Sequence, residues 1–104
     1  MKLIPPKYVQ ENAKKAIKCL DKGSTAMLRV GRRRATQLAS GKPVGEVTLK
    51  KMNAFRRHKK NASYEGNICD DNGAVAWLGW GASVSKGKGK TDGLDWAKRM
   101  LKKI

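Results

Sequence analysis

The chain has 104 residues, with 24 Lys and Arg against 8 Asp and Glu, and its formal net charge is +16. This length accommodates one domain with a modest core, so we expect a single domain over residues 1–104. No run of residues approaches the roughly 18 consecutive apolar positions that a membrane span needs, which argues against a membrane protein.

The first predicted helix opens at Pro5 and Pro6 and runs to about Leu20. Proline fits the first turn of a helix because its missing N–H would be unpaired there. Apolar residues then recur at helical spacing along one face. The sequence Asp21-Lys22-Gly23 ends the helix, and Gly23 is suited to a left-handed cap.

A second helix is predicted from a cap at Ser24 or Thr25 to about Ala39. Its buried stripe is expected to comprise Leu28, Gly31, Ala35 and Leu38. After a break at 40–43, a third, strongly basic helix is predicted over about 45–60. A helix-turn-helix is a poor match to this turn, and an ordinary helical hairpin fits it better.

Residues 61–73 contain no Lys or Arg and are expected to hold turns and one short extended segment near Tyr64 and Ile68. The apolar run over 74–81 predicts a buried helix, although its periodicity alone does not decide between helix and strand. We expect Trp77 in the core, with Trp80 the most exposed of the three tryptophans. The basic segment Ala82–Gly93 is predicted to be a flexible loop.

A last helix is predicted over about 92–104, with Leu94, Ala97 and Ile104 facing inward beside Trp96. Together these elements predict a mainly α fold, a compact bundle of four to five short helices. A basic Gly/Lys loop precedes the C-terminal helix in this arrangement.

The positive charge is concentrated in two parts of the chain. Residues 29–60 carry eleven basic side chains and one acidic one, and three further lysines alternate with glycine over 86–90. Like charge without internal partners opposes compactness, so a polyanion outside the fold is expected to offset it. The candidate phosphate contacts are Arg29, Arg32, Arg33, Lys50, Lys51, Arg56, Arg57, Lys59, Lys60, Lys86, Lys88 and Lys90.

Motifs for catalysis are weak. Gly89-Lys90-Thr91 resembles the end of a phosphate-binding loop, but Val84 stands where its first glycine belongs. The cysteines and His58 lack the paired spacing of a zinc site. Glu65, Asp70 and Asp71 are the only candidate carboxylate set, and ordinary turn chemistry explains Asp71-Asn72-Gly73 better than catalysis does. We therefore expect no enzyme, no cofactor and no metal.

Cys19 and Cys69 are too few for a disulfide framework. The opening residues lack the apolar run of a secretory signal, which predicts an intracellular protein. In a reducing compartment two free thiols are the expected state, although one bridge is possible.

The order of several short motifs resembles a small helical domain found in phage-encoded proteins. The matching residues are Pro5-Pro6, Arg34-Ala35, Leu38-Ala39-Ser40-Gly41, Met52 with Phe55, Arg57-His58, Ala76-Trp77, Trp80-Gly81, Gly93-Leu94 and Trp96-Ala97. The resemblance implies a phage origin and a compact helical fold, but no reaction. This chain departs from the pattern by inserting the basic segment 82–92.

Three functions fit these features. The first is a phage-encoded nucleic-acid-binding protein that contacts the phosphate backbone, preferably of duplex DNA, with little sequence specificity. The second is a host-directed protein that docks on an acidic surface of a host enzyme, and the third is a virion or head component. The expected location is the cytoplasm of the infected host cell, or the virion.

Overall fold

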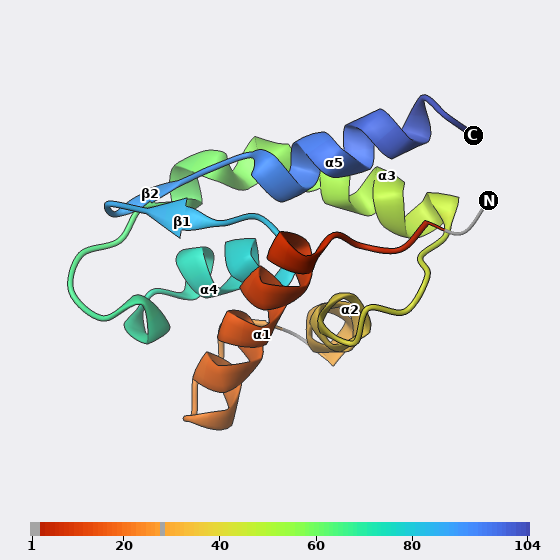
Figure 1. Cartoon of the computed structure of the whole chain (residues 1–104). Coiled ribbons are helices and arrows are strands. Elements are labelled where there is room, and N and C mark those ends of the chain that lie inside the picture. The colour runs from red at the N-terminus through yellow and green to blue at the C-terminus, as the bar shows by residue number, and fades with distance from the viewer. Residues whose placement is uncertain (1–2, 28) are drawn as a thin grey trace.

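The computed structural model describes residues 3–27 and 29–104, without the side chains of residues 29 and 30. Within that part the chain forms five α-helices, two 3-10 segments and one short β-hairpin (Figure 1). This is the mainly α bundle that the hydrophobic pattern predicts. The elements are α1 (Lys7–Asp21), α2 (Arg29–Ala39), α3 (Glu46–Ala54), η1 (Phe55–Ala62), η2 (Ile68–Asp70), α4 (Asn72–Gly79), β1 (Val84–Ser85), β2 (Lys88–Gly89) and α5 (Asp92–Leu101).

Helix α1 begins at Lys7, after an extended Pro6, so the two prolines precede the helix and do not form its first turn as predicted. The helix ends as its sequence predicts. Gly23 adopts a φ of 107°, and its N–H bonds to the carbonyl of Leu20 while the N–H of Ser24 bonds to that of Cys19. This pair of bonds satisfies carbonyls that the helix end would otherwise leave free. α1 packs on α2 and α4, while α3 lies along α5 (Figure 1).

The core is built around α4. Trp77 is fully buried, as predicted, and Val75 and Leu78 flank it on the same short helix. Asp71, which belongs to the turn predicted before the apolar run 74–81, caps α4 by accepting a 2.9 Å hydrogen bond from the N–H of Ala74. The cap provides a partner for one of the free N–H groups in the first turn of the helix. Trp80 is half-buried and stacks on Phe55 with 5.6 Å between ring centroids.

Helix α2 and its surroundings correct two expectations. The hydroxyl of Ser24 accepts a hydrogen bond from the N–H of Ala26, so it caps a local turn, and the helix begins only at Arg29. Leu28, predicted for the buried stripe, lies outside the described residues. The predicted helical hairpin is also wrong, because α2 packs mainly on α1 and α3 packs mainly on α5.

The third predicted helix, the segment that follows it and the C-terminal helix also differ from prediction. The third helix continues beyond Ala54 as the 3-10 segment η1, and residues near Tyr64 and Ile68 form no strand. α5 ends at Leu101, and Ile104 is 54% exposed, so the expectation that it packs inward is wrong.

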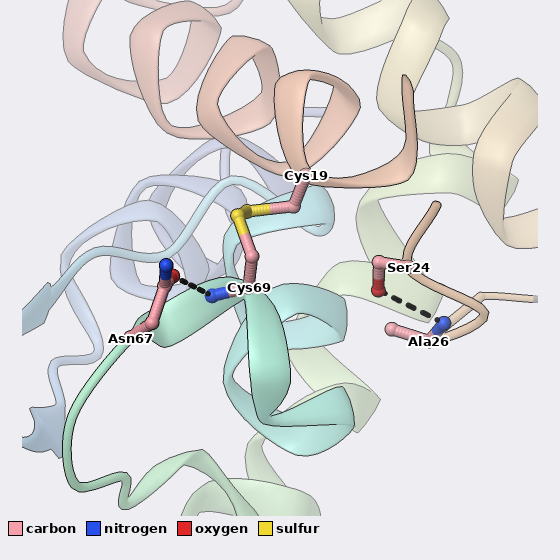
Figure 2. Close-up of a disulfide and its surroundings, with 5 residues drawn as sticks. All are labelled: Cys19, Ser24, Ala26, Asn67 and Cys69. Carbon is pink, nitrogen blue, oxygen red and sulfur yellow. Dashed lines mark hydrogen bonds between the residues drawn. A yellow bond between two sulfur atoms is a disulfide. The ribbon is translucent and has the colours of Figure 1, made fainter. Parts of the chain in front are cut away.

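The cysteines form a disulfide, which corrects the expectation of two free thiols. Cys19 near the end of α1 bonds to Cys69 in η2 (Figure 2). Their Cα atoms are 5.0 Å apart, although 50 positions separate them in the chain. The bond therefore ties the first helix to the segment that leads into α4.

Over residues 3–27 and 29–104, no helix is both long enough and apolar enough to cross a bilayer.

Candidate nucleic-acid interface

The basic segment 82–92 contains a β-hairpin, formed by β1 and β2, and the expectation of a flexible loop there is wrong. Val84 pairs with Gly89 and Ser85 with Lys88 in an antiparallel register. The two turn residues, Lys86 and Gly87, have φ values of 53° and 76°. Positive φ at both positions is typical of the tight turns whose twist matches two-stranded hairpins.

The base of the hairpin is held by Trp77. The indole Nε1–H of this buried side chain lies 2.8 Å from the carbonyl oxygen of Lys90 and 3.1 Å from that of Ser83. These carbonyls flank the two strands. A core aromatic residue thus determines where the basic hairpin lies.

Two glycines allow the hairpin to lie against the rest of the protein. A Cβ atom on Gly89 would stand 2.7 Å from Cβ of Ala62 and 3.0 Å from Nε1 of Trp77. The carbonyl of Gly87 accepts a hydrogen bond from the N–H of Tyr64. The alternation of glycine and lysine therefore provides close packing on one side and exposed charge on the other.

Replacing Gly89 with alanine is expected to destabilise the protein by about 1–3 kcal/mol, the usual cost of overpacking. The added methyl group would have to displace Trp77 or Ala62. Urea unfolding followed by tryptophan fluorescence measures this change. Ser85→Ala, at an exposed site of the paired strand, is the control and should change stability by less than about 0.5 kcal/mol. Equal stability of both variants would contradict the close packing.

The hairpin and the end of η1 enclose an open cleft of about 590 Å³. Four lysines from these two segments line it, and no carboxylate does. Its lining residues are Lys59, Lys60, Ser63, Lys88, Gly89, Lys90 and Thr91. All four lysines are exposed, and none takes part in an ion pair within the described part of the chain. We call this feature the lysine cleft.

One end of the lysine cleft is braced by Asp95 of α5. Its Oδ1 lies 2.8 Å from Nη2 of Arg56, and its Oδ2 accepts a 2.9 Å hydrogen bond from the hydroxyl of Thr91. The Arg56 hydrogen bond, assisted by that of Thr91 and opposed by partial burial, lowers the pKa of the Asp95 carboxyl. Arg56, predicted to contact phosphate, therefore has a structural partner.

The Asp95 contact predicts a pH dependence of stability. Because the pKa is lowered in the folded state, the contact contributes above the unfolded pKa and is lost as the pH falls through the folded pKa. Asp95→Asn should cost at most about 1 kcal/mol at pH 7, since the pair is partly exposed. The difference from the unmodified chain should therefore shrink as the pH falls below the ordinary aspartate value of 3.8 and through the lowered folded pKa.

Urea unfolding at pH 7 and pH 3 measures this difference. Asp70→Asn removes the same charge at an exposed position and serves as the control. An equal cost of Asp95→Asn at both pH values would show that the carboxylate charge contributes nothing.

The structure brings together only part of the predicted contact set. Lys59, Lys60, Lys88 and Lys90 share the lysine cleft. Lys86 lies at the tip of the hairpin and lines a neighbouring hollow that also contains Glu65 and Asp71.

The remaining predicted contacts lie outside the cleft. Lys50 pairs with Glu46 at 3.7 Å, and Nε of Arg57 donates to Nε2 of His58. Lys51 and Arg33 are exposed. Nη2 of Arg32 lies 2.7 Å from Oδ1 of Asp21, and the side chain of Arg29 lies outside the described residues.

The cations of α2 belong to a different region from the hairpin. Figure 1 shows α2 in the lower right of the view, whereas the hairpin lies at its left edge. The predicted contacts therefore do not form one continuous face. The lysine cleft is the place where two of the basic segments converge.

Sequence reasoning missed the uncharged members of the cleft. Ser63 and Thr91 contribute hydroxyl groups to the lining, and the buried Gly89 lies between Lys88 and Lys90 in the chain. It also missed Arg34, which links α2 to α3 through a 3.0 Å hydrogen bond to the buried hydroxyl of Thr48. Only the polar turn signal around Ser63 could have indicated the first of these positions.

Two motifs that the sequence offered, a metal-ligand set and a phosphate-binding loop, can be compared with the described residues. No three His, Cys, Asp or Glu side chains gather there as they would around a metal ion. The first turn of α5 follows the loop-like Gly89-Lys90-Thr91, but the carboxylate of Asp92 already accepts hydrogen bonds from the N–H groups of Ser83 and Gly93. A phosphate would meet this negative charge at the helix start.

Comparison with known proteins adds no assignment. No protein-family model matches the chain, and neither a curated protein nor a solved structure matches it.

Proposed function

We propose that this chain is a phage-encoded nucleic-acid-binding protein that holds the phosphate backbone of duplex DNA in the lysine cleft. The observation that supports the proposal is the convergence of Lys59 and Lys60 with Lys88 and Lys90 around an open cleft without carboxylates. Cations positioned by packed backbone attract successive phosphates without reading bases. Binding with little sequence specificity follows from this arrangement.

The chemistry of the cleft suits a phosphate chain better than a single anion. The exposed Ser63 lines the cleft together with lysines from η1 and from the hairpin. Contacts to phosphate commonly combine such neutral donors with lysines. The hairpin is already ordered by Trp77, so binding requires little loss of conformational freedom.

The salt dependence of binding tests this function. Replacing Lys59, Lys60, Lys88 and Lys90 together with glutamine should lower the slope of log affinity against log salt by about 3 to 4, because each phosphate contact contributes about 0.9. Fluorescence anisotropy with a labelled 20-base-pair duplex measures the slope between about 50 and 200 mM salt.

The matched control removes four exposed lysines elsewhere, Lys7, Lys98, Lys102 and Lys103. It has the same net charge as the cleft variant and should keep nearly the full slope. Equal losses in both variants would mean that diffuse charge, not the cleft, attracts DNA. Absence of binding by the unmodified protein at 50 mM salt would refute the function, and tighter binding of duplex RNA or single strands would change the proposed ligand.

The disulfide favours a virion-associated role as the second candidate. Disulfides persist in oxidising surroundings such as a released particle and are rare in the cytoplasm. In that role the cleft would face packaged genome. Mass spectrometry of purified particles tests this candidate, which requires the chain to be present with Cys19 and Cys69 joined.

A further inference from the structure

A second groove lies beside the disulfide and shares no residue with the lysine cleft. It has a volume of about 310 Å³ and runs between the C-terminal half of α1 and the segments around η2 and β1. Its apolar part is formed by Ile68, Leu78 and Val84 together with the disulfide. Figure 2 shows how the Cys19–Cys69 bond spans from α1 to η2.

The rim of this groove is positively charged. It is lined by Lys15 and Lys18 of α1 and by Lys22, which directly follows that helix. All three side chains are exposed. None of them pairs with a carboxylate within the described residues. The neighbouring Asp21 is engaged by Arg32 at 2.7 Å. The rim charge is therefore left for an external partner.

The spacing of the lysines indicates an extended partner. Positions 15, 18 and 22 fall near one face of a helix and span about 10 Å at 1.5 Å per residue. A phosphate backbone has no apolar group that could cover the apolar floor of the groove, whereas a peptide presents apolar and charged side chains together. The groove is at the small end of ligand sites and can enclose about one large apolar side chain.

We propose that this groove binds an acidic peptide segment of a partner protein. One apolar side chain of the peptide enters the floor formed by Ile68, Leu78 and Val84, and flanking carboxylates meet the three lysines. The charge complementarity of an acid-free, lysine-rimmed groove selects this partner. The interaction is separate from nucleic-acid binding and goes beyond that function.

The test uses a labelled nine-residue peptide with a central leucine flanked by glutamate and aspartate, at 150 mM salt. Fluorescence anisotropy should show binding that weakens about tenfold in the triple variant Lys15→Gln, Lys18→Gln, Lys22→Gln, because exposed charge pairs each contribute modestly. The triple variant Lys7→Gln, Lys98→Gln, Lys102→Gln has the same net charge and should bind like the unmodified protein.

Changes in the peptide separate specific docking from general attraction of charge. Replacing its leucine with serine should also weaken binding about tenfold, since the buried side chain is lost. Equal binding of the leucine and serine peptides, or equal effects of the two triple variants, would overturn the proposal. Loss of binding to phosphatidylglycerol vesicles in the rim variant, with peptide binding unchanged, would overturn it in favour of a lipid surface.

The same measurement separates this proposal from the nucleic-acid function. The variant that removes Lys59, Lys60, Lys88 and Lys90 should bind the peptide normally while losing DNA. If the unmodified protein binds the peptide but not DNA, the peptide proposal still holds. If it binds DNA but not the peptide, the nucleic-acid function still holds. Equal weakening of peptide binding by the lysine-cleft variant and the rim variant would count against a distinct site.

Discussion

Replacing Trp77 with alanine is expected to lower the free energy of unfolding by about 3–5 kcal/mol. The side chain is fully buried, and its Nε1–H bonds to the carbonyls of Ser83 and Lys90 at the base of the hairpin. Domains of this size are stable by roughly 5–15 kcal/mol, so the variant should be close to unfolding. Urea denaturation followed by circular dichroism measures the loss.

Trp77→Phe separates the hydrogen bonds from the packing. The ring remains largely in place, but the carbonyl of Lys90 loses its indole donor, at a cost of about 1–3 kcal/mol. We expect this variant to fold and to show increased proteolysis within 83–91, together with weaker binding of DNA. A fully protected hairpin in Trp77→Phe would show that the indole hydrogen bonds do not position it.

Removing the disulfide should cost about 2–4 kcal/mol of stability. The bond closes a loop between positions 50 apart, so its loss restores many conformations to the unfolded chain. In a domain of about 100 residues this corresponds to a fall in Tm of about 10–30 °C. Thermal unfolding of Cys19→Ala, Cys69→Ala against the unmodified chain measures it.

Reductant provides the matched control for this experiment. Dithiothreitol should lower the Tm of the unmodified chain toward that of the double variant and leave the double variant unchanged. An unmodified chain that is unaffected by reductant, with two thiols that react with a labelling reagent after unfolding without reduction, would show that the bond is not formed.

Local sequence signals predict the helices well where the chain has both a helical spacing of apolar residues and capping residues at the helix ends. Gly23 after α1 has the predicted capping role, because it acts through backbone geometry within a few residues. Pro6 is the extended residue before α1, so the prediction that it lies in the first turn is wrong. The apolar run around Trp77 was correctly assigned to a buried helix. The start of α2 was missed because Ser24 caps a turn at Ala26, which sequence spacing does not distinguish from a helix cap.

The sequence did not predict the hairpin because glycine occurs both in flexible loops and at positions where close packing leaves no space for a side chain. Alternating glycine and lysine over 86–90 is typical of flexible loops, but Gly89 is required here by the closeness of Ala62 and Trp77. That requirement depends on residues far away in the chain. The disulfide was missed for the same kind of reason, since only the packing of α1 beside η2 brings Cys19 within reach of Cys69.

The amino-acid sequence alone determined the helical class, the sites of most helix ends and the excess of positive charge. These properties follow from side-chain period, backbone conformation and composition, all of which are local or additive. Only the tertiary structure decided which cations meet. Lys59 and Lys88 line one cleft because Trp77 and Gly89 hold the hairpin against the end of η1, whereas Arg32 is drawn to Asp21. Such convergence depends on contacts between distant segments, which no local pattern encodes.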